Sequence, residues 1–145
     1  RHRPAGRTGW GDRRPAPVGD RSTPVIGIGT DLVDVDRFRR SLDRTPGLRE
    51  RLFRPDERAY AEQANDPAVR FAARFAAKEA TLKALGLGLG AMALYDIEVV
   101  REPSGRPTLC LHGSAALTAT EAGVGRWVLT LSHTGRVAQA TVVAL

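Results

Sequence analysis

The segment from Asp66 to Gly86 constrains the fold more than any other part of the chain, because it predicts one long helix. Asp66 followed by Pro67 is typical of a helix N-terminus, and Gly86 is a typical stop. Large apolar residues recur at helical spacing and define a core face: Phe71, Phe75, Leu82 and Leu85. Small residues border that face: Ala72, Ala76 and Ala80. Another element can therefore pack closely against this helix.

The residues before this helix predict a strand and three shorter helices. Residues 25–33 are apolar and β-branched, with glycines at alternate positions, which indicates a buried strand. The glycines suggest close approach by another backbone or by a ligand. Helical segments are expected at 34–42, 47–53 and 56–64.

After the long helix the hydrophobic pattern changes to strands. Residues 95–101 and 108–112 predict one hairpin, and residues 127–132 and 137–144 predict a second. A helix over 114–122 separates them. This order of elements favours an α+β fold, with a largely antiparallel sheet packed with the long central helix. A length of 145 residues fits one domain, which we expect to span residues 25–145.

Residues 1–24 are rich in arginine, proline and glycine and show no apolar periodicity, so we expect a disordered extension. They hold six arginines against two aspartates, and contribute much of the net charge of +6. An arginine-rich arm can contact nucleic acid. Without interleaved aromatic residues or a nucleic-acid motif, however, nucleic acid is not expected as a partner.

The rest of the composition points to an ordinary globular protein. No apolar run is long enough to span a membrane, and the N-terminal residues lack the apolar stretch of a secretory signal. The single cysteine, Cys110, rules out an internal disulfide framework and a site of several cysteines. Within the alternation Leu109-Cys110-Leu111 we expect it to be buried. Nothing requires an oxidising compartment, so a cytoplasmic location is expected.

The two lysines indicate a phosphate-handling site. Lys78 and Lys83 are the lysines of a chain that otherwise uses 20 arginines, and both lie near Glu79 on the long helix. A compact ammonium meets phosphate as a point charge, which the planar arginine fork does not do. The following run Gly86-Leu87-Gly88-Leu89-Gly90 is not a Walker loop. It could present amides to a phosphate or simply connect two elements.

Two carboxylates could hold a metal ion. Asp31 interrupts the apolar strand, where an unpaired carboxylate is costly, and Glu79 lies on the helix beside Lys83. Mg²⁺ accepts such a pair, because it keeps several waters and takes further ligands from substrate phosphates. Two alternatives stay open. Asp31, at the strand end, could cap the following turn or pair with Arg37, and Glu79 could form a solvated helix pair with Lys83.

Histidines give a weaker signal. His133 follows Leu131-Ser132 at a predicted hairpin tip, where a polar side chain projects from a rigid support. His112 ends a strand and suggests no role. No Ser-His-Asp order and no metal-binding histidine pair is visible, so hydrolase and zinc functions have little support.

Four of these elements together resemble the holo-acyl-carrier-protein synthase family of 4'-phosphopantetheinyl transferases. They are Ile28-Gly29-Thr30-Asp31-Leu32 with Arg37 six beyond the aspartate, Arg74-Phe75-Ala76-Ala77-Lys78-Glu79-Ala80 with Lys83, Gly105-Arg106-Pro107, and Leu131-Ser132-His133-Thr134. They occur in the family's order, and the resemblance spans essentially all of residues 25–145.

The resemblance implies an enzyme that transfers the phosphopantetheine arm of coenzyme A to a serine of an apo acyl carrier protein, releasing adenosine 3',5'-bisphosphate. Asp31 and Glu79 match the family's magnesium ligands. Lys83, with Lys78 and Arg74 as further candidates, would contact the phosphates of coenzyme A. Glu79, or a water held near it, would take the serine proton.

Further site residues and partners also follow from the resemblance. Gly105, Pro107, Ser132 and His133 would receive the nucleotide end of coenzyme A. The family's small form implies a homotrimer that binds coenzyme A between neighbouring subunits.

The arginines between Arg37 and Arg58 predict where a carrier would dock. These eight arginines outnumber the acids in the same segment, which predicts a basic helical face for acidic carrier proteins, with Arg37 as a docking residue. A solvated helix surface is the alternative.

A non-catalytic coenzyme A or nucleotide-binding module is the alternative function. It would not need both Asp31 and Glu79.

Overall fold

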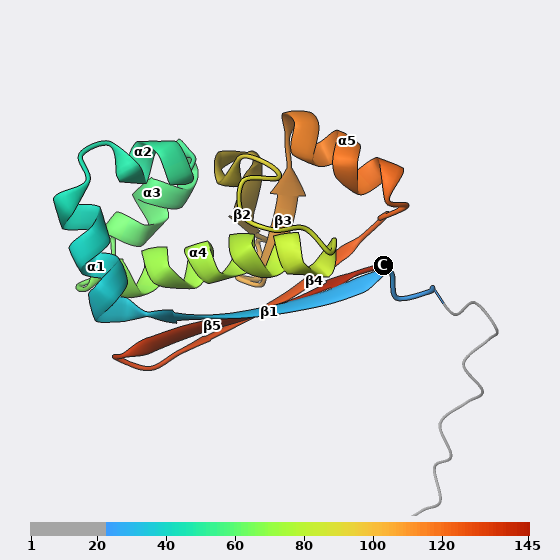
Figure 1. The fold of residues 1–145 in the computed structure, drawn as a ribbon. Helices are drawn as coiled ribbons and strands as arrows, with labels where there is room; N and C mark the ends of the chain where they lie inside the picture. The colour runs from blue at the N-terminus through green and yellow to red at the C-terminus, as the bar shows by residue number, and fades with distance from the viewer. Residues whose placement is uncertain (1–22) are drawn as a thin grey trace, which may run out of the picture.

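A computed structural model describes residues 23–145, which are arranged in three layers (Figure 1). Helix α4 (Pro67–Ala84) runs through the middle layer. On one side lies a three-stranded antiparallel sheet in the order β1-β5-β4. Its strands are β1 (Gly27–Asp34), β4 (Trp127–His133) and β5 (Val137–Ala144). This is the α+β architecture with a long central helix that the sequence predicts.

The other side of α4 holds the remaining elements (Figure 1). Three helices precede α4: α1 (Val35–Arg44), α2 (Leu48–Leu52) and α3 (Pro55–Glu62). After it come the short 3₁₀ helix η1 (Leu94–Asp96), strands β2 (Ile97–Arg101) and β3 (Pro107–Leu111), and helix α5 (Gly113–Glu121). Both predicted hairpins are present. They belong to two separate sheets within the described residues, because β2 pairs with β3 alone.

Strand β1 packs directly on the backbone of α4. A Cβ added at Gly29 would lie 1.9 Å from the carbonyl oxygen of Ala80, and one at Gly27 would lie 1.7 Å from that of Ala84. The predicted close approach is therefore made by a helix backbone. The expectation that β1 is buried is wrong for its other face, since Ile28 is 65% exposed and Leu32 is 69% exposed. Alternate residues of a strand point to opposite faces, so these two point away from α4.

Aromatic side chains hold the short helices onto α4. Phe38 of α1 stacks on Phe75 of α4, with ring centroids 4.8 Å apart, and Phe53 lies 4.9 Å from Phe71. Asp66 does not cap α4 with its side chain as predicted. Its carboxylate instead accepts hydrogen bonds from both terminal nitrogens of Arg39, which lowers the pKa of Asp66 and ties α1 to the start of α4.

Two further predictions concern membrane-spanning segments and the N-terminal extension. Within residues 23–145, every helix is too short or too polar to cross a membrane. Apart from residues 23 and 24, the predicted disordered extension lies outside the described residues. The boundary at residue 25 stays a prediction.

Candidate active site

The alternation that turns Gly29 toward α4 also brings Asp31 to this helix. Lys83 donates one hydrogen bond to Asp31 Oδ1 and another to the carbonyl oxygen of Thr30, each at 3.0 Å. The Asp31 side chain is 18% exposed and that of Lys83 is 52% exposed. The alternative in which Asp31 pairs with Arg37 is wrong, because the cation beside Asp31 is Lys83.

Glu79 lies one turn before Lys83 and is half-buried. Burial raises the pKa of Glu79 above its usual value, and the negative charge of Asp31 raises it further, whereas Lys83 lowers it. Among residues 23–145 no ion pair joins Glu79 to Lys83, so the simple helix pair is not formed. The strand carboxylate and the helix carboxylate thus face one region, where their like charges interact unfavourably.

This donor set fits a magnesium ion. It consists of hard carboxylate oxygens from two rigid elements, which is the kind of site that Mg²⁺ occupies with substrate phosphates. A divalent cation between Asp31 and Glu79 would offset both the repulsion and the burial cost that raise the pKa of Glu79.

Lys78 does not belong to this region. Its side chain is fully buried, and its ammonium donates to Glu57 Oε2 at 2.9 Å and to the carbonyl oxygens of Leu94 and Ile97. An ammonium has three donors, and all three are used here. The prediction that Lys78 contacts coenzyme A does not fit this geometry. Burial lowers the pKa of Lys78, an effect that Glu57 opposes.

Glu57 is the partner that sequence reasoning missed. It is 1% exposed, and its carboxylate accepts from Lys78 and from the backbone N–H groups of Arg54 and Val99. These bonds connect α3, α4 and β2. The signal in the sequence was its place as the third residue of a helix that begins with Pro55, where a glutamate can cap the N-terminus.

A cavity of about 310 Å³ brings together four of the residues predicted to bind coenzyme A: Arg74, Gly105, Pro107 and His133. They come from α4, from the β2–β3 turn and strand β3, and from the end of β4. Ser132 is not among the lining residues. It is exposed, and the alternation along β4 turns it away from the face that carries His133. The structure therefore does not support Ser132 as a contact in this cavity.

Three arginines surround one tyrosine on the wall of this cavity. The guanidinium carbons of Arg70, Arg74 and Arg101 lie 4.1, 4.3 and 4.6 Å from the centre of the Tyr60 ring. Arg74 is 4% exposed, and its buried Nε atom has no hydrogen-bond partner among residues 23–145. Burial is the main cause that lowers the pKa of Arg74. Such a wall suits an anionic group such as phosphate.

Sequence reasoning missed Arg70, Arg101 and Tyr60. Arg70 precedes Arg74 by one helical turn, so the two share a face of α4, and that spacing was a usable signal. Arg101 and Tyr60 come from β2 and α3, and their approach depends on tertiary packing.

The carboxylates and the cavity lie at opposite edges of the three-stranded sheet. Asp31 belongs to β1 and His133 to β4, and these strands are the two edges of the sheet, with β5 between them (Figure 1). On α4, Glu79 follows Arg74 by five residues, which turns their side chains to different faces of the helix.

The predicted basic face is partly exposed. Four of its eight arginines are exposed: Arg37, Arg40, Arg44 and Arg51. The other four have partners within the protein: Arg39 with Asp66, Arg54 with Asp96, Arg58 with Glu50, and Arg49 over the Phe71 ring. Arg37 is thus available for an acidic partner.

Comparison with known proteins gives a consistent result. A family model described as the 4'-phosphopantetheinyl transferase superfamily matches residues 27–138. The holo-[acyl-carrier-protein] synthase of Frankia alni is 48% identical over 120 residues, which cover 83% of this chain and 97% of that protein.

Solved structures agree. The crystal structure of holo-[acyl-carrier-protein] synthase from Neisseria meningitidis has a TM-score of 0.77 at 32% identity and covers 84% of this chain and 99% of its own. A "Chronobacterium ammoniagenes ACPS-CoA complex" has a TM-score of 0.72 at 30% identity, covering 81% and 94%. With the family model and the relatives each matching most of the chain, the protein belongs to the holo-[acyl-carrier-protein] synthase family of the 4'-phosphopantetheinyl transferase superfamily.

Proposed function

We propose that this protein transfers the 4'-phosphopantetheine group of coenzyme A to a serine hydroxyl of an apo acyl carrier protein and releases adenosine 3',5'-bisphosphate. The observation that carries the proposal is the convergence of Asp31, Glu79 and Lys83 where β1 packs on α4. Relatives named holo-[acyl-carrier-protein] synthase, one of them in complex with coenzyme A, support the same reaction.

Asp31 and Glu79 would hold Mg²⁺, which when bound neutralises charge on the diphosphate of coenzyme A. The ammonium of Lys83 is half exposed and lies beside Asp31, so it can contact a phosphate oxygen as a point charge.

The reaction breaks one phosphorus–oxygen bond and forms another. The serine oxygen attacks the phosphorus that carries the pantetheine arm, and the bond to adenosine 3',5'-bisphosphate breaks. Glu79, or a water held against it, takes the serine proton. Binding in fixed geometry and charge stabilisation supply most of the catalysis in phosphoryl transfer.

The cavity at the other edge of the sheet would receive the nucleotide end. Arg74, with Arg70 and Arg101, offers positive charge for a phosphate of the ligand, and Gly105, Pro107 and His133 complete the wall. Because this cavity and the carboxylates lie at opposite edges of the three-stranded sheet, one coenzyme A molecule would use the carboxylates of one subunit and the cavity of its neighbour.

A homotrimer accounts for the separation of the carboxylates from the nucleotide cavity. It also accounts for the exposed apolar residues on the open face of the sheet. This face carries Ile28 and Leu32, which are 65% and 69% exposed, beside Thr30. Its burial between subunits would remove apolar area from water at about 25 cal/mol per Å². The cytoplasmic location expected from the sequence stays a prediction.

One experiment separates this function from a non-catalytic coenzyme A-binding module. Apo acyl carrier protein is incubated with coenzyme A, Mg²⁺ and this protein, and the carrier is followed by intact-mass spectrometry. We expect the mass of one phosphopantetheine to be added, and Glu79→Gln to abolish the addition. Binding of coenzyme A without any change in carrier mass, across a panel of apo carriers, would support the module instead.

A further inference from the structure

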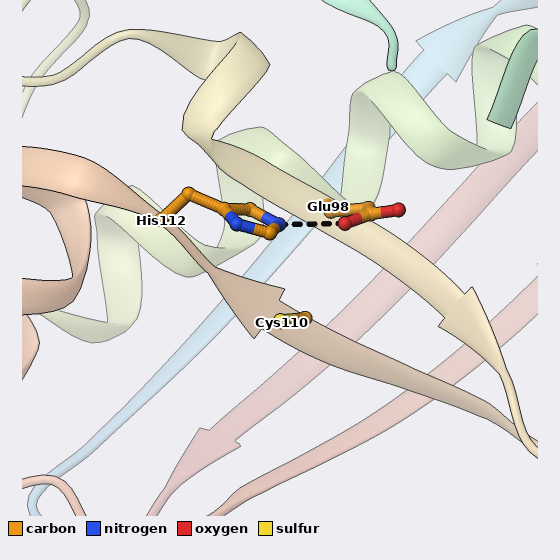
Figure 2. A group of neighbouring side chains, drawn as sticks. All are labelled: Glu98, Cys110 and His112. Carbon is orange, nitrogen blue, oxygen red and sulfur yellow. Dashed lines mark hydrogen bonds and ion pairs between the residues drawn. The ribbon is translucent and has the colours of Figure 1, made fainter. Parts of the chain in front are cut away.

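The outer face of the β2–β3 hairpin carries Glu98, Cys110 and His112 (Figure 2), none of which lines the proposed nucleotide cavity, although Glu98 lines a neighbouring pocket with Arg74 and Arg101. One candidate ligand atom from each residue lies within 4.8 Å of the other two. His112 Nε2 and Glu98 Oε2 are 2.6 Å apart. A carboxylate, a thiol and an imidazole that meet on one surface form a donor set of the kind that binds zinc.

The register of strands β2 and β3 brings Glu98, Cys110 and His112 together. Glu98 and Cys110 are directly paired across the two antiparallel strands, and His112 follows Cys110 by two residues. Paired residues and residues two apart project from the same face of a hairpin. The opposite face is apolar and buried in the core through Ile97, Val99 and Leu109. The hydrophobic pattern that fixes the register therefore also fixes the three polar side chains on the outer face.

The position of Cys110 corrects a prediction from the sequence. It was expected to be buried, but it is exposed, because the alternation turns its neighbours Leu109 and Leu111 inward. Glu98 and His112 are also reachable, with side chains 14% and 34% exposed. A metal ion can enter this site from solvent without opening the core.

The backbone around the site is held in place. The His112 N–H donates to the carbonyl oxygen of Asp96 at 2.8 Å, and His112 is also the N-terminal cap residue of α5. Zinc–ligand distances of about 2.0–2.3 Å place tetrahedral ligand atoms roughly 3.5 Å apart. The three candidate ligand atoms, all within 4.8 Å of one another, already lie close to that spacing.

We propose that Glu98, Cys110 and His112 bind one zinc-class divalent cation through a carboxylate oxygen, the thiolate sulfur and an imidazole nitrogen. A water completes the tetrahedron, as it does in zinc sites with three protein ligands. Binding releases the thiol proton and replaces the His112–Glu98 hydrogen bond. The ion connects β2, β3 and the start of α5.

The donor set separates this site from the magnesium site. Asp31 and Glu79 offer carboxylate oxygens, which suit Mg²⁺, whereas a thiolate and an imidazole favour zinc and its neighbours in the transition series. The hairpin turn also carries Gly105 of the nucleotide cavity. By the strand register the metal ion would lie at the end of the hairpin opposite that turn, and it would use none of the proposed catalytic residues. The proposal does not depend on the transferase function.

Cobalt is the probe for the test, because its thiolate complexes show a near-ultraviolet charge-transfer band that oxygen ligands do not give. The metal-free full chain is titrated with Co²⁺ in excess Mg²⁺, which occupies the carboxylate site. Since Cys110 is the single cysteine of the chain, any such band reports on this residue. We expect one equivalent of Co²⁺ to produce the band and Zn²⁺ to remove it.

Variants decide whether three residues form the site. Cys110→Ser should abolish the band, and Glu98→Gln and His112→Gln should each weaken Co²⁺ binding by about tenfold or more. Glu79→Gln is the matched control and should bind Co²⁺ like the wild type. Zn²⁺ should raise the Tm of the wild type and not that of His112→Gln. Absence of the band, or a band of equal affinity in Glu98→Gln and His112→Gln, would overturn the proposal.

Discussion

Gly29 lies against Ala80 so closely that a Cβ added to the glycine would fall 1.9 Å from the alanine carbonyl oxygen. This contact fixes the distance between the strand that carries Asp31 and the helix that carries Glu79. The small residues on both elements thus do more than fill space. They set the separation of the two carboxylates.

Substitution of Gly29 should therefore affect both stability and transfer. Gly29→Ala forces β1 away from α4, and overpacking of this kind costs about 1–3 kcal/mol. Urea denaturation should show this loss in the free energy of unfolding, and Mg²⁺-dependent transfer should fall with it. Gly88→Ala is the matched control, because a Cβ there meets no atom of the described residues within 4 Å. Equal stability of the two variants would show that the close contact is not important.

The two lysines should behave in opposite ways. Lys78→Met leaves the Glu57 carboxylate buried without its ammonium, which costs about 3–5 kcal/mol. Lys83→Met removes a half-exposed pair worth about 0–1 kcal/mol, and should instead abolish most of the transfer activity. Denaturation and carrier modification are measured on both variants.

A double variant tests the cause of the loss at Lys78. In Glu57→Gln with Lys78→Met the uncompensated carboxylate is gone, so part of the lost stability should return. If Lys78→Met is as stable as the wild type, the buried Lys78–Glu57 pair does not stabilise the fold. The prediction that Lys78 contacts a phosphate of coenzyme A would then have to be tested again.

The raised pKa of Glu79 predicts a pH dependence of stability. The folded protein holds this proton more strongly than the unfolded chain, so its contribution to stability is present below the usual pKa of a glutamate. It is lost as the pH rises through the pKa of the folded state. Without metal, Glu79→Gln should thus gain in Tm over the wild type at pH 7 but not at pH 4. Added Mg²⁺ should raise the Tm of the wild type more than that of the variant.

The sequence predicted the secondary structure because this depends on local pattern. The helix over 67–84 and the two hairpins follow from spacing and residue type. The roles of Asp31 and Glu79 as metal ligands stay a prediction. The roles of the two lysines could not be separated that way. They lie five residues apart on α4, and only packing shows that Glu57 reaches one and Asp31 the other.

The same limit applies to the Glu98, Cys110 and His112 group. Its members lie on two strands, and the register that pairs Glu98 with Cys110 is a tertiary fact. Similarly, the expected burial of β1 overlooked that α4 covers only one face of the three-stranded sheet, so Ile28 and Leu32 lie on the open face.

Carrier docking on the basic face gives a kinetic prediction. Arg37→Glu reverses an exposed charge near the start of α1 and should raise the KM for the carrier roughly tenfold, equivalent to about 1.4 kcal/mol, with little change for coenzyme A. Arg126→Glu is the matched control, because it makes the same change of charge at an exposed residue just before the start of β4. If both variants raise the KM for the carrier equally, the effect comes from the net charge of the protein and not from docking at Arg37.

Mixing two inactive variants tests whether the active site is shared between subunits. Glu79→Gln lacks a carboxylate, and His133→Ala lacks a residue of the cavity at the other edge of the sheet. In a cyclic trimer with sites between neighbours, a random equal mixture restores both halves at about a quarter of the interfaces. Co-expression, or joint refolding, should therefore recover roughly that share of wild-type transfer.

A mixture of the two single variants Glu79→Gln and Lys83→Met is the control for that experiment. Both residues lie at the same end of the proposed site, on one helix, so no interface of a mixed trimer regains an intact pair. Activity should then stay at the level of the separate variants. Recovery in the control, or none with His133→Ala, would mean that the carboxylates and the cavity do not act on one coenzyme A across subunits. Each protomer would then have to close its site around its own α4.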